Sequence, residues 1–236
     1  MSNRTTGHCI KKVVLYPDQG VVGLRHRRAY VAMSLNNKIV ESVETLTEVL
    51  QWMIDHFQEF VVIVGDYLHR HNVEFLDGAT ESEAIEASMK RGQRIVEQVG
   101  SILNKLGQPQ VRILSSAEFY QSANFENRLA ELLRLEREVP AFHELTEFTL
   151  GVYLNRKGIQ VHDQPKARKH SRAYLAEELV IFEQLAEHGY DVSVYPGGQL
   201  PVMKALVTGR LPNVSPALEK LTLVEMKFRP VKNAAQ

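Results

Sequence analysis

The sequence FVVIVGDY at residues 60–67 gives the clearest indication of the fold. Its first five residues are apolar without polar alternation, which is typical of a strand buried on both faces of a parallel sheet. A second candidate strand, residues 29–34 (AYVAMS), precedes it, and residues 43–60 carry apolar side chains at a helical period. The pattern therefore predicts a strand, a helix and a second strand in sequence.

The rest of the chain continues this alternation. A long helical pattern over 80–106 begins with Thr80 and Glu83 at the spacing of a capping box. The further elements expected are a strand at 110–114, helices at 117–138, 141–156 (largely buried) and 170–188, and strands at 191–195 and 221–228. Pro140 separates the first two of these helices, and Gly189 ends the third. This order predicts an α/β protein with a mostly parallel sheet and helices on both faces.

Composition and charge describe an ordinary globular protein. Of the 236 residues, 44% are hydrophobic and 24% are charged, which excludes a disordered or fibrous chain. Basic and acidic residues both number 28, so the net charge of zero gives no general indication of nucleic-acid binding. No repeat or flexible linker divides the chain, and we expect residues 1–236 to form one domain.

Several classes of protein are excluded by what the sequence lacks. Cys9 is the only cysteine, which excludes an internal disulfide and a cysteine-cluster zinc site and fits a reducing cytoplasm. No apolar run approaches the ~20 residues of a membrane span, and residues 1–12 lack a signal-peptide core. The patterns GxGxxG, GxxxxGK(S/T) and GxSxG are absent. We therefore expect a soluble cytoplasmic protein without a nucleotide cofactor.

Polar side chains follow three of the expected strands. Ser34, Asp66 and Tyr195 each stand at a strand end, and open α/β sheets bind ligands beyond the carboxyl ends of their strands. We expect these three side chains to converge. His69 and His71 are candidate metal ligands together with Asp66, but a polar loop after the strand is the simpler interpretation, and no metal site is predicted.

Tyr174 and Glu178 form a candidate binding pair within SRAYLAEELVIFEQL, residues 171–185. Four residues apart on a helix, they share a face, while Leu175, Leu179 and Phe182 on an adjoining face would dock the helix on the sheet. A carboxylate beside a phenol can hold a primary amine, because the carboxylate binds its charge or takes its proton and the phenol orients it. A surface pair without a function is the alternative.

The pattern as a whole resembles the tRNA-dependent cyclodipeptide synthases. The matching pieces are AYVAMSLNN (29–37), FVVIVGDY (60–67), SMKRGQR (88–94), YLNRKG (153–158), AYLAEELVIF (173–182) and DVSVYPGGQLPV (191–202). The resemblance implies a Rossmann-like fold similar to the catalytic domain of class I tyrosyl- and tryptophanyl-tRNA synthetases. It also implies two finished aminoacyl-tRNAs as substrates in place of ATP, which agrees with the missing nucleotide motifs.

The resemblance implies roles for five residues. Ser34 matches the nucleophilic serine that takes the first aminoacyl group as an ester, and Tyr174 and Glu178 match the pair that binds the aminoacyl amine. Tyr195 matches a tyrosine near the serine, and Asn155 matches a polar residue expected to support the pocket. A second aminoacyl-tRNA amine then attacks the acyl-serine, and the dipeptidyl-tRNA closes to a cyclic dipeptide, a 2,5-diketopiperazine.

The residue after Tyr195 divides this family into a histidine group and a proline group, and Pro196 puts the chain with the latter. Asn37, three residues after Ser34, departs from that pattern because it is the residue expected of the histidine group. Asn36 stands beside it, so the alignment is open to a shift by one residue. Asn37 is therefore kept as a candidate substrate-binding residue, and the sequence does not decide between it and Asn36.

Two residues before the serine are candidates for the amino-acid pocket. Tyr30 and Ala32 share the face of Ser34 on a strand, so they either line that pocket or pack in the core. As a pocket wall, Tyr30 would favour small side chains.

Two groups of basic residues are candidates for phosphate contacts. The resemblance places a helix with Lys90, Arg91 and Arg94 against the first tRNA. A second basic run, with Lys166, Arg168 and Lys169, is expected to precede the Tyr174 helix. A solvated helix face is the alternative for both groups.

The leading hypothesis is thus a monomeric aminoacyltransferase that uses two aminoacyl-tRNAs, needs no cofactor or metal, and binds neither DNA nor a membrane. A non-catalytic aminoacyl-tRNA-binding module on the same fold is the alternative, and it would bind tRNA without forming an acyl-serine. A third possibility is another small-molecule enzyme on a Rossmann-like sheet, such as a methyltransferase, and the missing glycine-rich loop counts against it.

Overall fold

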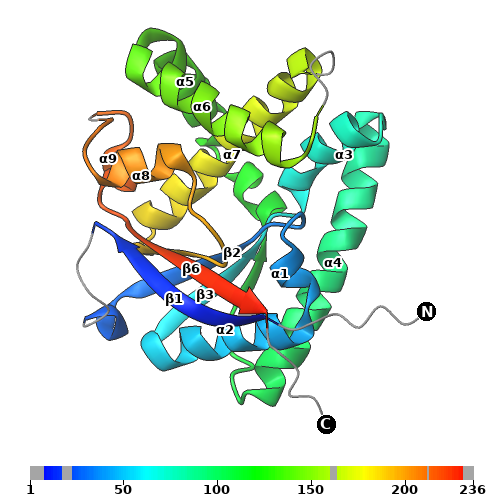
Figure 1. Ribbon diagram of the computed structural model, residues 1–236, viewed down its shortest axis with the longest axis vertical. Helices are drawn as coiled ribbons and strands as arrows, with labels where there is room; N and C mark the ends of the chain where they lie inside the picture. Colours follow the sequence, from blue (N-terminus) through cyan, green and yellow to red (C-terminus); the bar gives the residue numbers. More distant parts are fainter. Residues whose placement is uncertain (1–7, 18–22, 160–163, 212, 231–236) are drawn as a thin grey trace.

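The centre of the protein is a six-stranded sheet with helices on both faces (Figure 1). The structure is a computed structural model that describes residues 8–17, 23–159, 164–211 and 213–230. The strands within these ranges are β1 (His8–Tyr16), β2 (Arg28–Met33), β3 (Glu59–Val64), β4 (Ile113–Ser115), β5 (Val192–Tyr195) and β6 (Thr222–Pro230).

Helices form a separate layer on each face of the sheet. They are α1 (Lys38–Glu41), α2 (Val43–His56), α3 (Arg70–Leu76), α4 (Glu81–Lys105), α5 (Phe125–Glu138), α6 (Pro140–Arg156), α7 (Gln164–Glu187), α8 (Pro201–Val207) and α9 (Pro216–Glu219). Short 3-10 turns are η1 (Leu24–His26), η2 (Tyr67–His69) and η3 (Ser116–Gln121). One buried core contains Leu46 of α2 and Val99 of α4, and the other contains Leu179 of α7 and Met203 of α8. No helix in the described ranges is long and apolar enough to cross a membrane.

The strand order is that of a doubly wound sheet. Across the sheet it runs β1-β6-β5-β2-β3-β4, with β2 to β6 mutually parallel and β1 antiparallel to β6 at one edge. From β2 the chain moves outward through β3 to β4, and then returns to the other side of β2 to form β5 and β6. The connections therefore diverge between β2 and β5, where sheets of this kind bind ligands. The predicted Rossmann-like α/β class is confirmed.

The apolar stretches that predicted the sheet are buried on both faces. In β2, Tyr30 and Ala32 belong to the core on the α7 side, whereas Val31 and Met33 belong to the core on the α2 side. In β3, every residue from 60 to 64 is at most 6% exposed. Strand alternation thus divides each apolar run between two cores.

The long helix α4 begins as predicted and approaches the sheet closely at one glycine. Thr80 accepts a hydrogen bond from the backbone N–H of Glu83, whose side chain accepts one from the Thr80 N–H, which completes the capping box. A Cβ atom at Gly92 would lie under 3.0 Å from Asp66, at the end of β3. Glycine therefore lets α4 pack against this strand end.

Three predicted elements differ from the structure in extent or burial. Helix α6 is not largely buried, because a single stripe with Phe142, Leu150 and Leu154 faces the core while Phe148 is 59% exposed. Helix α7 begins at Gln164, so the basic run expected before the Tyr174 helix forms its first turns. The helix expected over 117–138 is divided into η3 and α5.

Other elements were not predicted at all. Strand β1 carries two consecutive lysines, Lys11 and Lys12, at the sheet edge, and helices α1, α8 and α9 are only four to seven residues long. Residues 67–76, expected as a polar loop, form η2 and α3. A buried ion pair between Arg70 and Glu177 of α7, and a hydrogen bond between His71 and the same carboxylate, hold this segment in place.

Candidate active site

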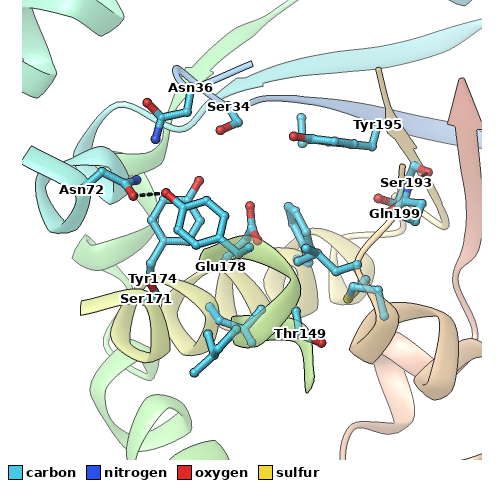
Figure 2. A pocket seen from close by; sticks show the side chains of 17 residues that line it. Ser34, Asn36, Asn72, Thr149, Ser171, Tyr174, Glu178, Ser193, Tyr195 and Gln199 are labelled. Carbon is cyan, nitrogen blue, oxygen red and sulfur yellow. Dashed lines mark hydrogen bonds between the residues drawn. The ribbon is translucent and has the colours of Figure 1, made fainter. Parts of the chain in front are cut away.

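A cavity opens beyond the carboxyl ends of β2 and β5 (Figure 2). It contains about 810 Å³ of atom-free space, counting its open mouth. Its wall combines the ends of the two strands with side chains of α3, α6, α7 and α8. The position is the one that the divergence of the chain connections predicts for a ligand.

Ser34 and Tyr195 form the side of the cavity next to the sheet (Figure 2). Ser34 follows the last residue of β2, and Tyr195 is the last residue of β5, the neighbouring parallel strand. The carbonyl of Ser34 accepts a hydrogen bond from the backbone N–H of Asn37 at 2.9 Å, so the chain turns directly after the strand. Two of the three predicted strand-end residues are thus brought together.

Tyr174 and Glu178 face these residues from α7, where their spacing puts both on one side of the helix (Figure 2). Burial raises the pKa of Tyr174 well above its usual value, and the charge of Glu178 adds to the effect, while a hydrogen bond with Ser34 acts in the opposite direction. The phenol therefore stays protonated near neutral pH. It can donate a hydrogen bond in the immediate surroundings of the serine hydroxyl.

The carboxyl group of Glu178 has no hydrogen-bond partner or ion pair within the described ranges. Burial raises its pKa to about 8. A free α-amino group titrates near ~8, so a proton can pass between such an amine and this carboxyl group at little cost. Glu178 can therefore bind an ammonium ion as a carboxylate and can also accept its proton.

The adjacent carboxylate, Glu177, has the opposite environment. It accepts hydrogen bonds from Arg70 at 2.9 Å, from His71 at 2.9 Å and from Tyr120 at 2.5 Å. Burial acts to raise its pKa, but the hydrogen bond and charge of His71 and the charge of Arg70 outweigh burial and lower it. Glu177 thus fixes α7 to α3, whereas Glu178 remains available to a ligand.

Polar side chains gather at one end of the cavity. They are Asn36, Asn72, Tyr153 and Ser171. The Tyr153 hydroxyl donates to Oδ1 of Asn72 at 2.6 Å. Burial raises the pKa of Tyr153 to about 12, while a hydrogen bond with Asn36 acts against the rise. This end offers both donors and acceptors to the hydroxyl and carbonyl groups of a ligand.

Most of the remaining wall is apolar. It is formed by Leu150 of α6, Leu175 and Phe182 of α7, Leu200, and Met203 of α8. Leu175 and Phe182, which were expected only to dock α7 on the sheet, therefore also line the cavity. An apolar wall beside the carboxyl group of Glu178 suits a ligand that carries an apolar side chain next to an amine.

Three residues expected to bind substrate do not line the cavity, whereas Ala32 does. Tyr30 is fully buried behind the wall, where its ring packs against Phe182 with centroids 5.2 Å apart. Of the two alternatives for Tyr30, the structure therefore supports packing in the core, and its assignment as a substrate-binding residue is not supported. Asn155 lies on the exposed side of α6, because the helix turns Tyr153 rather than Asn155 toward the cavity.

Asn37 has a structural position beside the site. Its Oδ1 accepts from the backbone N–H of Ile39 at the start of α1, and its Nδ2 donates to the carbonyl of Pro196 at 2.7 Å. It thereby ties the turn after Ser34 to the turn after Tyr195. Asn36, rather than Asn37, lines the cavity.

Several wall residues were missed in the sequence, although helical spacing contained a signal for some of them. Extending the face of Tyr174 and Glu178 by helical periods in both directions leads to Ser171 and Phe182. Ser193 stands two residues before Tyr195 in β5, so strand alternation contained a signal for it as well. Asn72 and Gln199 had no such signal, because the arrangement of α3 and of the chain after β5 brings them to the wall.

The six basic side chains predicted to contact phosphate differ in whether they pair with an acidic side chain of the protein. Lys90 and Arg94 of α4 and Lys166 and Lys169 of α7 are exposed and form no ion pair with a described residue. Arg91 instead contacts Glu41 at 3.1 Å and His69 at 3.3 Å.

Arg168 is also held within the protein, because it pairs with Glu147 of α6. The four free side chains are therefore better placed for an anionic partner than the two paired arginines.

Asp66 and His69 are not brought into a metal site with each other. Oδ1 of Asp66 accepts hydrogen bonds from the backbone of Tyr67 and from Ser115 and Ser116, which joins the ends of β3 and β4. Asp66 therefore has a structural position, and its expected convergence with Ser34 is wrong, since it does not line the cavity.

Comparisons with known proteins identify the fold. No protein-family model and no curated protein sequence matches the chain. Among solved structures, a CDPS (cyclodipeptide synthase) from Fluoribacter dumoffii aligns with 94% of this chain and 100% of its own, at 19% identity and a TM-score of 0.77. A cyclodipeptide synthase from Candidatus Glomeribacter gigasporarum, bound to Phe-tRNAPhe, aligns with 91% of this chain and 93% of its own, at 20% identity and a TM-score of 0.60.

A tyrosyl-tRNA synthetase is also similar. The enzyme from Archaeoglobus fulgidus, complexed with L-tyrosine, aligns with 92% of this chain and 60% of its own, at 15% identity and a TM-score of 0.53. The chain thus has the fold of the cyclodipeptide synthases, together with the likeness to a tRNA synthetase that the resemblance implies.

Proposed function

We propose that this protein is a cyclodipeptide synthase, which joins the aminoacyl groups of two aminoacyl-tRNAs into a cyclic dipeptide through an ester on Ser34. The observation that carries the proposal is the meeting of Ser34, Tyr174, Glu178 and Tyr195 in one cavity. A hydroxyl nucleophile, an amine-binding pair and a second phenol are the groups that this chemistry needs. The fold shared with cyclodipeptide synthases supports the same conclusion.

In the first step, Oγ of Ser34 attacks the ester carbon of the first aminoacyl-tRNA. The bond from this carbon to Oγ forms, the bond to the ribose oxygen breaks, and the serine proton passes to that oxygen. One ester replaces another, so the exchange is close to balanced and needs no ATP. The phenols of Tyr174 and Tyr195 lie where they can donate hydrogen bonds to the serine or to the developing oxyanion.

In the second step, the ammonium group of the second aminoacyl-tRNA gives a proton to Glu178, and the free amine attacks the acyl-serine. The amide bond forms, Oγ of Ser34 leaves and regains a proton, and a dipeptidyl-tRNA results. Its own amine then attacks its ester and releases the tRNA. The pKa of about 8 suits Glu178 to this exchange, because donor and acceptor are closely matched.

The apolar wall bears on the first amino acid. An aminoacyl group whose amine lies against Tyr174 and Glu178 would place its side chain near Leu175, Phe182 and Met203. We therefore propose an apolar side chain for this substrate. The earlier argument for a small side chain depended on Tyr30, which does not line the cavity.

For the tRNA we propose contacts with the four free basic side chains. Lys90 and Arg94 project from α4, and Lys166 and Lys169 project from the first turns of α7. Replacing each pair by Gln should weaken tRNA binding and reduce its salt dependence, since each lost phosphate contact lowers the slope against log salt concentration by about 1. We further infer a single domain of the proline group, acting as a monomer in the cytoplasm.

Mass spectrometry of the medium from a culture that expresses the protein tests the proposed activity. The wild type should release diketopiperazines that are absent from a culture expressing Ser34→Ala, and their masses would identify the two amino acids. Normal diketopiperazine production by Ser34→Ala would contradict the proposal.

Acid quenching of the purified protein with a radioactively charged tRNA provides the direct assay. The wild type should retain the label as an acyl-serine, and Ser34→Ala should not. Retention of tRNA without a labelled protein would instead support the non-catalytic aminoacyl-tRNA-binding module.

A further inference from the structure

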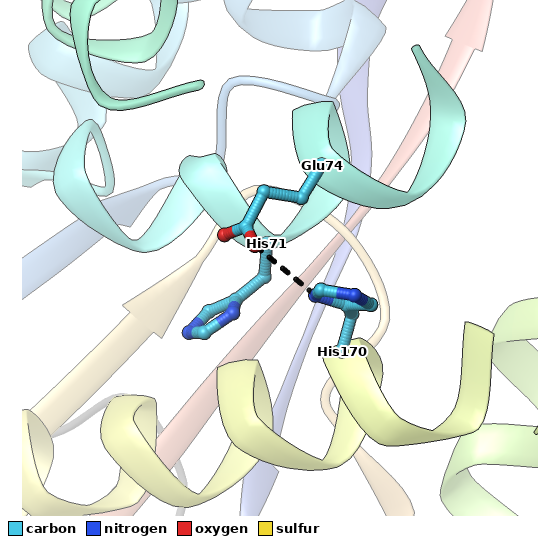
Figure 3. A group of neighbouring side chains, drawn as sticks. All are labelled: His71, Glu74 and His170. Atoms are coloured by element: carbon cyan, nitrogen blue, oxygen red, sulfur yellow. Dashed lines mark ion pairs between the residues drawn. The ribbon is translucent and has the colours of Figure 1, made fainter. Parts of the chain in front are cut away.

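Three side chains with metal-binding groups meet between α3 and α7, outside the cavity. His71 and Glu74 lie three residues apart on α3, and His170 comes from α7 (Figure 3). One possible ligand atom from each residue lies within 4.8 Å of the other two. Because two imidazoles and a carboxylate form a known zinc-binding set, we propose that these residues bind one zinc-type ion.

The distances are close to what such an ion requires. Two ligand atoms at ~2.1 Å from a tetrahedral zinc are about 3.4 Å apart, so ligand atoms that now lie within 4.8 Å of one another need to close by at most about 1.4 Å. The rings of His71 and His170 have centroids 6.2 Å apart, and Oε2 of Glu74 lies 3.9 Å from Nδ1 of His170. Glu74 and His170 are only partly buried, which leaves them room to rotate inward.

Glu177 orients one of the ligands. Its carboxylate accepts a hydrogen bond from Nε2 of His71 at 2.9 Å, which leaves Nδ1 as the nitrogen available to an ion. Metal-bound histidines commonly donate their other N–H to a carboxylate, because this fixes the tautomer and the ring orientation. Arg70 and Tyr120 in turn hold Glu177, so the His71 ring is positioned before any ion binds.

Charge and donor type narrow the choice of ion. Glu74 supplies one negative charge, whereas Lys166 and Lys169 stand on the same helix as His170 and oppose a cation. Calcium and magnesium need several oxygen ligands, which this group lacks. Imidazole nitrogens favour zinc, cobalt or nickel. A bound ion would join α3 to α7 and so stabilise the packing of these two helices.

Cobalt provides a visible probe for the site. The full-length protein, freed of any affinity tag and of metal, should bind one Co²⁺ per chain, with the absorption bands of a tetrahedral site. The double variant Glu74→Gln/His170→Gln should bind at least tenfold more weakly. His188→Gln is the matched control, because this exposed histidine lies away from the group, and it should bind like the wild type.

Thermal unfolding gives a second readout that needs no activity. The wild type should melt at a higher temperature with Zn²⁺ than with a chelator, and the double variant should show no such difference. Its melting temperature in chelator should stay near that of the wild type, which establishes that it folds. Failure of the wild type to bind a stoichiometric ion, or equal binding by the double variant, would overturn the proposal. Neither result depends on the proposed synthase activity.

Discussion

Ser34 and Tyr195 extend into one cavity from neighbouring strands whose register pairs Val31 with Val194. Both strands lie inside the sheet, so backbone hydrogen bonds rather than a flexible loop set the separation of the two side chains. Groups held on a rigid scaffold keep a reactive geometry at a low entropic cost. The proposed nucleophile and its neighbouring phenol are therefore in position before a substrate arrives.

Replacing Glu178 by Gln should inactivate the protein and also stabilise it at neutral to alkaline pH. The pKa of Glu178 is raised from 4.5 to about 8, so its contribution to folding is complete below the lower value and is lost as the pH rises through the higher one. Each pKa unit corresponds to about 1.4 kcal/mol, so the wild type should lose up to a few kcal/mol relative to the variant between pH 5 and pH 8. Denaturant unfolding at both pH values measures this difference.

Glu177→Gln is the control for this prediction. It replaces the adjacent carboxylate of α7, which forms a buried ion pair with Arg70 and accepts a hydrogen bond from His71. Removing one partner of a buried pair costs about 3–5 kcal/mol, so this variant should be destabilised. If Glu178→Gln had the same pH dependence of stability as the wild type, the carboxyl group would not have its raised pKa.

Gly92→Ala should destabilise the protein by about 3 kcal/mol or more, because the added methyl group would overlap Asp66 in a closely packed region. Gly100→Ala is the control in the same helix, since its methyl group would meet only Ile113 at an ordinary 3.8 Å. In a helix interior this second change should be neutral or stabilising by about 0.5–1 kcal/mol. Equal effects of the two changes, measured by denaturant unfolding, would contradict the close approach of α4 to β3.

Tyr174→Phe should slow formation of the acyl-serine by about 10²-fold or more, since it removes one hydrogen-bond donor near the reacting oxygen. Single-turnover labelling with charged tRNA measures this rate. The variant should still bind tRNA, because the proposed phosphate contacts lie on other side chains. Tyr67→Phe, outside the cavity, should react at the wild-type rate. A normal rate for Tyr174→Phe would exclude the phenol from the acylation step.

Tyr153→Phe should cost about 1–2 kcal/mol of stability, because Oδ1 of the buried Asn72 loses the donor that lies 2.6 Å away. Asn72→Leu removes the other partner, and the double variant should be less destabilised than the sum of the single changes. A coupling of about 0.5 kcal/mol or more in this cycle, measured by denaturant unfolding, would confirm the contact. Strict additivity would mean that the two side chains do not interact.

The sequence predicted most of the sheet and part of the site, for identifiable physical reasons. Residues 29–34 and 60–64 are apolar throughout, and burial on both faces requires that pattern. Tyr174 and Glu178 could be paired from helical spacing alone. The resemblance identified Ser34 and Tyr195 as partners, and strand order explains how they meet.

Other parts depended on contacts between distant segments. The helical course of residues 67–76 is stabilised by Glu177, more than 100 residues away in the chain, so a local pattern of polar residues suggested a loop. Tyr30 and Ala32 share a strand face, yet only Ala32 lines the cavity, because Phe182 covers the ring of Tyr30. Periodicity gives the face of a residue but not what packs against it.

Glu177 and Glu178 are consecutive, but Glu177 is held by hydrogen bonds whereas Glu178, within the part of the chain that the structure describes, is not. The rotation of α7 about its own axis therefore decides which kind of carboxyl group the cavity contains. A turn of one residue, about 100°, would replace the solitary acid in the cavity by its neighbour and leave Arg70 without its anion. The ion pair between Arg70 of α3 and Glu177 therefore fixes the rotation of α7 about its axis. Through this contact, α3 determines which of the two acids faces the cavity.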